Sequence, residues 1–129
     1  MRLSVRGTRP AAAVWADYAQ ITRWPVWAPH LTSVEADADR IAVGVTGRVH
    51  GGPVPLPFRV TAVDEDAMTW TWRVLGIELV HAVRAVPGGC LTTFHGPAPY
   101  LPVAWFALRR LVSPRGSGRR QQAGDRGDG

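Results

Sequence analysis

The feature that most limits the fold of this chain is an alternation of apolar and polar side chains between positions 41 and 94. Runs such as Phe58 to Ala62 and Met68 to Val74 repeat with a period of two, which is typical of strands that bury one face. Turn-forming residues interrupt these runs at hairpin spacing, so neighbouring strands are expected to pair antiparallel. The pattern predicts a meander of six or seven strands, in which one strand runs from Ile41 to Val49.

Helical periodicity flanks the alternating region on both sides. After a short strand at Leu3–Val5, apolar residues recur at helical spacing over residues 11–18, and two prolines then confine the chain to a second, very short helix. Another apolar stripe spans Tyr100–Leu111 and predicts a closing helix that covers the sheet. The expected fold class is therefore α+β.

Length and composition indicate one folded domain. The chain has 129 residues, of which 46% are apolar, enough for one hydrophobic core and too few residues for two. We expect this domain to span residues 1–112. Residues 113–129 contain no apolar residue larger than Ala123, so they are predicted to form a disordered Arg/Gly-rich tail.

The charge and hydropathy patterns exclude several classes of partner. The formal net charge is +5, but the tail holds four arginines against two aspartates and no interleaved aromatic residues, so nucleic-acid binding is not expected. No apolar run approaches the roughly 20 residues that span a bilayer, so stable membrane insertion is not expected either. A monomer and a homodimer both remain open. Trp105 and Phe106 flank Arg109 opposite the apolar stripe, where they suit a dimer contact, a membrane-surface contact or the cover of a sheet edge.

Cysteine and histidine usage bears on compartment and cofactors. A lone Cys90 permits no internal disulfide, and the N-terminus has no signal-peptide pattern, which together favour a cytoplasmic location. The histidines are scattered without metal-ligand spacing, and no glycine-rich phosphate loop precedes a helix. We therefore expect neither a metal nor a cofactor.

Several short motifs, in a fixed order, are similar to those of a known superfamily. They are Trp24-Pro25-Val26-Trp27, Pro29-His30-Leu31, Trp70-x-Trp72-Arg73, His81 and Pro87-Gly88-Gly89. With the order of elements, they make residues 3–112 resemble the SRPBCC superfamily, which includes START, Bet v 1-like helix-grip, and polyketide cyclase/dehydrase and lipid-transport proteins. The resemblance implies a helix-grip fold, in which a curved antiparallel sheet wraps around the C-terminal helix and leaves a pocket for lipids, polyketides or similar apolar molecules. It implies no shared catalytic residue.

Aromatic residues are the main candidates for the wall of such a pocket. Trp24 and Trp27 flank a proline-restricted turn, where rigid rings can stack on a planar ligand. Trp70 and Trp72 share one face of a strand and can line the floor. Plain core packing explains both pairs as well. The predicted ligand-binding residues are Tyr18, Trp24, Trp27, Trp70, Trp72, His81, Phe94, Val103 and Ala107.

His81 is the main candidate for chemistry. Its strand register places it on the apolar face with Leu79 and Val83, where an imidazole can act as a general acid or base on a bound carbonyl or enol. Thr93 and His95 make a weaker case on the next strand. A neutral histidine hydrogen-bonded to a neighbouring strand is the simpler alternative. Two functions therefore stay open: a binding protein for a hydrophobic small molecule, and a polyketide cyclase or aromatase that uses the same cavity.

Most charged and polar residues outside these positions are expected at the surface. Arg59, Arg73 and Arg84 alternate away from the apolar positions, which predicts an arginine-bearing outer face of the sheet. Asp17 is expected on the surface of the first helix, and His30 is expected to be solvated beside a turn.

Overall fold

The computed structural model of the protein describes residues 1–28, 30–97 and 101–113, and for residues 101–103 only the course of the backbone. Within these ranges the elements are β1 (Arg2–Gly7), α1 (Ala11–Ala19), η1 (Ile21–Arg23), α2 (Trp24–Trp27), β2 (Ser33–Ala36), β3 (Thr46–His50), β4 (Leu56–Asp64), β5 (Thr69–Val74), β6 (Ile77–Val86), β7 (Gly89–His95) and α3 (Leu101–Val112). The α+β class predicted from the sequence is confirmed. Apart from Ser113, the predicted tail at 113–129 lies outside the described residues.

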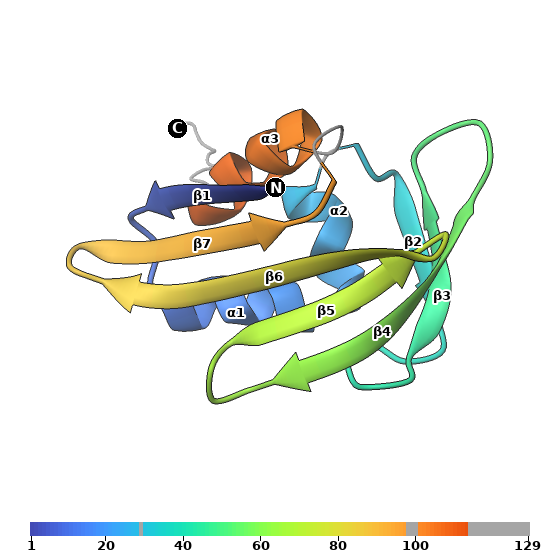
Figure 1. Ribbon diagram of the computed structural model, residues 1–129, viewed down its shortest axis with the longest axis horizontal. Helices are drawn as coiled ribbons and strands as arrows, with labels where there is room; N and C mark the ends of the chain where they lie inside the picture. The colour runs from blue at the N-terminus through green and yellow to red at the C-terminus, as the bar shows by residue number, and fades with distance from the viewer. Residues whose placement is uncertain (29, 98–100, 114–129) are drawn as a thin grey trace, which may run out of the picture.

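In the described part of the chain, seven strands form one antiparallel sheet in the order β1-β7-β6-β5-β4-β3-β2. Strands β2 to β7 follow one another as a meander, and β1 pairs with β7 at the far edge, with Val5 opposite Thr92. Figure 1 shows the curved sheet with α1 behind its middle strands and α3 beside β1. The helix-grip arrangement expected from the resemblance is therefore present.

Two tight turns explain why the central strands pair as hairpins. Leu75 and Gly76 join β5 to β6 with φ angles of 52° and 77°, the left-handed conformation at both central positions that suits the twist of a two-residue hairpin. Between β6 and β7, Pro87 precedes Gly88, whose φ is 82°. Proline followed by a residue with positive φ is the pattern of a type II turn. These turns set the register of the strands that carry the aromatic side chains.

The core lies between the inner face of the sheet and the helices. Val14 and Tyr18 of α1 and Leu111 of α3 are completely buried, as their spacing along an apolar helix face predicts. Cys90 on β7 is also completely buried, and burial raises the pKa of its thiol. Helix α3 packs mainly over β1 and joins α1 and α2 along the same side of the sheet.

Asp17 corrects one expectation, because it is buried and not on the helix surface. Only 5% of the residue is exposed. Its carboxylate accepts hydrogen bonds from Arg9 and Arg23, each at 2.9 Å. Arg9 also donates to the backbone oxygen of Leu111 at 2.8 Å. The two guanidinium groups offset the cost of removing the carboxylate from water, and Arg9 links the start of α1 to the end of α3.

The strand predicted from Ile41 to Val49 is wrong in its first half. Extended pairing in this region begins only at Thr46, although Ile41 is buried and its N–H donates to the backbone oxygen of Ala19. The φ of +94° at Gly44 turns the backbone out of the strand conformation before β3 begins. The alternation of side chains thus continues through a loop.

No helix within the described ranges is both long enough and apolar enough to cross a membrane. The longest, α3, has 12 residues and carries Arg109 and Arg110 in its last turn.

Candidate functional site

A cavity of about 260 Å³ lies between the inner face of the sheet, α2 and α3. Its lining is mostly apolar. Besides His30, six aromatic or imidazole side chains of the described residues contribute to it. These are Trp24, Trp27, Trp70, Trp72, His81 and Phe94. The volume is close to the lower end of the roughly 300–1,000 Å³ typical of small-molecule sites.

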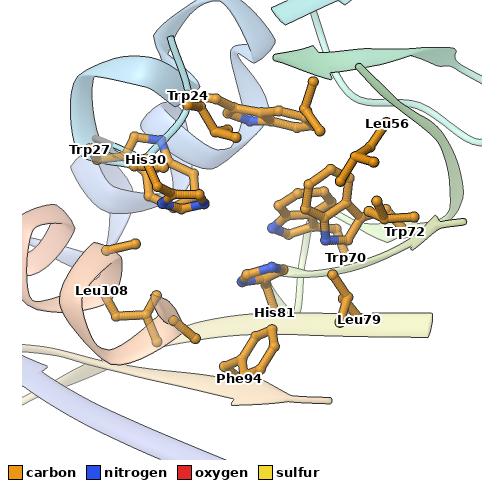
Figure 2. A pocket seen from close by; sticks show the side chains of 16 residues that line it. Trp24, Trp27, His30, Leu56, Trp70, Trp72, Leu79, His81, Phe94 and Leu108 are labelled. Atoms are coloured by element: carbon orange, nitrogen blue, oxygen red, sulfur yellow. The ribbon is translucent and has the colours of Figure 1, made fainter. Parts of the chain in front are cut away.

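Three neighbouring strands form the sheet side of the cavity. Trp70 on β5 lies opposite His81 on β6, and His81 lies opposite Phe94 on β7, so one row of paired positions crosses the sheet. The rings of Trp70 and His81 stack with centroids 4.7 Å apart and an interplanar angle of 13°. Trp72 follows two residues after Trp70 and therefore projects from the same face. Figure 2 shows this cluster facing the helical wall.

The opposite wall comes from α2 and α3. Pro25 lies in the single turn of α2, where its missing N–H costs nothing. This turn presents Trp24 and Trp27 to the cavity, and the indole of Trp24 also stacks on Trp70, with ring centroids 5.3 Å apart. The indole N–H of Trp24 donates to the backbone oxygen of Tyr18 at 3.0 Å, and that of Trp27 to the backbone oxygen of Asp17 at 3.2 Å. On α3, small side chains at Ala104 and Ala107 leave the space between this wall and the sheet.

The aromatic side chains around the cavity hold buried polar atoms that have no hydrogen-bond partner among the described residues. The indole nitrogens of Trp70 and Trp72, both ring nitrogens of His81 and the hydroxyl of Tyr18 are buried, and no described residue forms a hydrogen bond with them. Leaving such a group unsatisfied costs about 1–3 kcal/mol. Native proteins contain few of them, and each one calls for an explanation.

His81 is neutral in this setting. Burial lowers its pKa from 6.5 to about 3, because an imidazolium among aromatic rings loses its hydration. No ion pair to His81 is present within the described ranges. At neutral pH the ring therefore offers one donor nitrogen and one acceptor nitrogen.

Comparison with known proteins assigns a family. The chain matches the family model described as polyketide cyclase/dehydrase and lipid transport over residues 1–123. The chain belongs to this family. The resemblance to the SRPBCC superfamily is thereby confirmed, and membership in the polyketide cyclase/dehydrase and lipid transport family supports a fold that binds hydrophobic ligands. No curated protein matches the chain.

Solved structures share the fold of this family member at low sequence identity. A protein from Nitrosospira multiformis aligns with a TM-score of 0.70 and 12% identity, over 87% of this chain and 92% of that one. A protein from Thermobifida fusca, solved by solution NMR, aligns with a TM-score of 0.62 and 17% identity, over 87% and 83% of the two chains. At such identities the likeness concerns the fold alone.

The structure brings most of the predicted ligand-binding residues of this family member together. Trp24, Trp27, Trp70, Trp72, His81, Phe94 and Ala107 all line the cavity. Tyr18 lies behind the wall, with its ring 5.3 Å from that of His81 and 5.4 Å from that of Trp27. The side chain of Val103 lies outside the described residues. A role of these residues in binding stays a prediction.

Thr93 and His95, the weaker catalytic candidates, do not join His81. On β7 the buried positions are Cys90, Thr92 and Phe94, so the alternation turns Thr93 and His95 toward the outer face of the sheet. His95 is exposed, and neither residue lines the cavity.

Several lining residues were missed in the sequence. Leu79 and Val74 share strand faces with His81 and Trp72, and Leu108 shares the helix stripe with Ala107, so periodicity alone could have identified them. Leu56 and Val49 lie on the strands beyond. His30, expected to be solvated, is exposed and yet lines the cavity, where partial burial lowers its pKa. His30 belongs to a motif of the family resemblance, but neither periodicity nor spacing around it indicates that it lines the cavity.

The site offers little for metal chemistry. The described residues contain no group of three or more His, Cys, Asp or Glu side chains that could hold a metal ion. What the arrangement provides is apolar surface, stacked rings and a few unpaired nitrogen atoms.

Proposed function

We propose that this protein binds a hydrophobic small molecule, such as a lipid, a polyketide or a similar compound, in the cavity between the sheet and α3. The observation that carries the proposal is the 260 Å³ space among aromatic side chains. Burying apolar ligand surface there contributes roughly 25 cal/mol per Å². Flat ring systems gain further from contact with the aromatic side chains that line the cavity.

The alternative is a cyclase or aromatase that folds a reactive keto chain in the same cavity. His81 is the feature that favours it, because a histidine in the wall can move protons. Two observations weigh against it. The low pKa of His81 makes its protonated form costly at neutral pH, and Thr93 and His95 lie on the other face of the sheet. We therefore favour binding without catalysis.

A His81→Ala variant separates the two functions. A binding protein should keep its ligand affinity within about tenfold, because His81 supplies only part of the wall. A cyclase should lose turnover by about 100-fold or more, since removing a general acid or base has this effect. Steady-state turnover of a poly-β-keto substrate, measured beside binding of the same substrate, decides between them.

The binding function itself is tested in two steps. Native mass spectrometry of protein purified under non-denaturing conditions should detect a co-purified apolar molecule that disappears on denaturation. Isothermal titration calorimetry with tetralin, a two-ring hydrocarbon, should then detect binding to the emptied protein. Absence of both a co-purified molecule and tetralin binding would contradict the proposal.

A further inference from the structure

The buried indole N–H groups of this protein fall into two sets. Those of Trp15, Trp24 and Trp27, in the helical part, donate to protein oxygens at 2.8, 3.0 and 3.2 Å. Those of Trp70 and Trp72, on β5, have no hydrogen-bond partner among the described residues. The fold therefore satisfies the indoles of the helical side and leaves those of the sheet side unpaired.

The rings that carry these unpaired nitrogen atoms lie close together. His81, whose two ring nitrogens are also unpaired, stacks on Trp70, and the Trp70 and Trp72 ring centroids are 5.4 Å apart. All three side chains line the cavity, and Figure 2 shows them as one cluster on its sheet side. Other lining groups on this side, such as Leu79 and Phe94, are apolar.

The chemistry of these groups defines what would satisfy them. An indole N–H is a donor only, so its partner must be an acceptor. Neutral His81 adds a third donor and one acceptor nitrogen. A carbonyl oxygen accepts up to two hydrogen bonds through its lone pairs, so one such oxygen can satisfy two donors. A pure hydrocarbon would leave every one of these nitrogen atoms unpaired.

We propose that Trp70, Trp72 and His81 form a polar subsite that binds a carbonyl oxygen of an aromatic ligand about two fused rings in size. This inference rests on the proposed binding function and names the class of its ligand. The donors are already shielded from water, so the carbonyl oxygen gains hydrogen bonds without displacing water from the protein side.

The size follows from the cavity volume. An apolar cavity of about 150 Å³ accommodates benzene, so a volume of 260 Å³ holds about ten non-hydrogen atoms at the same packing. That is the size of a two-ring skeleton. A long acyl chain or a four-ring polyketide would extend beyond the cavity.

Access to the nitrogen atoms requires a movement of the side chains, because these atoms have almost no exposed surface in the unliganded protein. No hydrogen bond to a described residue fixes the His81 ring, but a turn of this ring must break its stacking on Trp70. We expect the side chains of the subsite to rearrange in this way when a ligand enters.

The test compares two ligands with one skeleton, tetralin and its ketone 1-tetralone. We expect 1-tetralone to bind at least as tightly as tetralin in calorimetry, although the ketone gives up hydrogen bonds to water. In ¹H–¹⁵N spectra of the ¹⁵N-labelled protein, the indole N–H signals of Trp70 and Trp72 should move downfield with 1-tetralone and not with tetralin. These measurements use the unmodified protein.

A matched pair of variants checks the assignment. Trp72→Phe removes an unpaired N–H and should reduce the preference for 1-tetralone over tetralin by about three- to tenfold, the effect of one hydrogen bond. Trp27→Phe makes the same replacement of an indole by a phenyl ring on the α2 side, where the indole N–H is bonded within the protein. It should change both affinities by similar factors and leave the preference intact.

The outcomes separate the inference from the proposed function. If tetralin binds more tightly than 1-tetralone and no indole signal shifts downfield with the ketone, the polar subsite is wrong while binding of hydrophobic molecules stands. If neither compound binds and no apolar molecule co-purifies, the proposed function fails and the subsite fails with it.

Discussion

His81 is the residue at which the environment changes the chemistry most. It stacks on Trp70, lies 5.2 Å from the ring of Phe94 and 5.3 Å from that of Tyr18, and is only 6% exposed. These rings exclude water and provide no counter-charge, which is why its pKa falls to about 3. The same surroundings that make His81 a poor proton carrier leave it available as a neutral hydrogen-bonding group.

This shift predicts a dependence of stability on pH. Between pH 6.5 and about 3 the unfolded chain binds a proton at His81 and the folded protein does not, so the free energy of unfolding falls as the pH is lowered. The contribution reaches at most about 1.4 kcal/mol per pH unit. Urea unfolding at several pH values between 7 and 4.5 should show wild type losing stability relative to His81→Phe. A stability difference that does not change with pH would contradict the low pKa.

A second prediction at the scale of single residues concerns Asp17. Replacing it with Asn removes the negative charge that Arg9 and Arg23 share, so Arg9, whose side chain is 18% exposed, loses its carboxylate partner. We expect a loss of about 3 kcal/mol in the free energy of unfolding, in the range measured for broken buried ion pairs. Asp66→Asn, in the exposed turn after β4, is the control and should change stability by less than about 0.5 kcal/mol. Equal stability of both variants would mean that the pair contributes nothing.

At the scale of elements, α3 determines how much of the cavity stays open. Ala107 is 4% exposed and lines the cavity, whereas the neighbouring Phe106 is 59% exposed on the outer side of the helix. The small side chains of Ala104 and Ala107 on the inner side leave space that larger side chains would fill. The helix therefore lines the cavity without filling it.

Filling this wall should block the site. Ala107→Leu adds three carbon atoms on the cavity side, and we expect tetralin affinity to fall by about tenfold or more while the melting temperature is unchanged or higher, because an apolar void is filled. Phe106→Leu is the control on the outer side of the same helix and should leave tetralin affinity unchanged. Tight tetralin binding by the Ala107→Leu protein would place the ligand elsewhere.

The elements differ in how far the sequence predicts them. Strands β4 to β7 follow from alternation and turn residues, because one face of each is buried against the helices and the other faces solvent. The short strand β2, Ser33–Ala36, was not predicted, since its four residues contain no apolar run and it pairs only at the sheet edge. The error before β3 has a different cause. Ile41 and Val45 lie before the start of β3 and are nevertheless buried, and burial of alternate residues in a loop produces the same pattern as a strand.

The site was predictable in outline and not in detail. The aromatic wall follows from the alternation of side chains along the strands and from the prolines around α2. Because Phe94 faces inward, the same alternation places Thr93 and His95 on the outer face of the sheet. The unpaired nitrogen atoms of Trp70 and Trp72 could not be predicted, because hydrogen bonding depends on which backbone oxygens come within about 3 Å in the folded chain. The burial of Asp17 depends in the same way on Arg9 and the end of α3.

At the scale of the whole molecule, the described helices cover one face of the sheet and leave the other to solvent. Arg59, Arg73 and Arg84 are exposed, as alternation predicted, so the outer face carries charge and the inner face carries the core and the cavity. Both faces of β7 illustrate this division, with Cys90 inside and His95 outside. The cavity thus lies on the core side of the sheet, and the exposed His30 is among its lining residues.

Because Cys90 is completely buried, the rate at which its thiol reacts reports how often the folded protein opens. A disulfide reagent such as Ellman's reagent needs an accessible thiolate, so the folded protein should react at least 100-fold more slowly than the urea-unfolded chain. Labelling kinetics would then measure how often β7 separates from the helices above it. A bound ligand should slow the reaction further, because it must dissociate before the sheet and the helices separate. Fast labelling of the native protein would mean that its interior opens often.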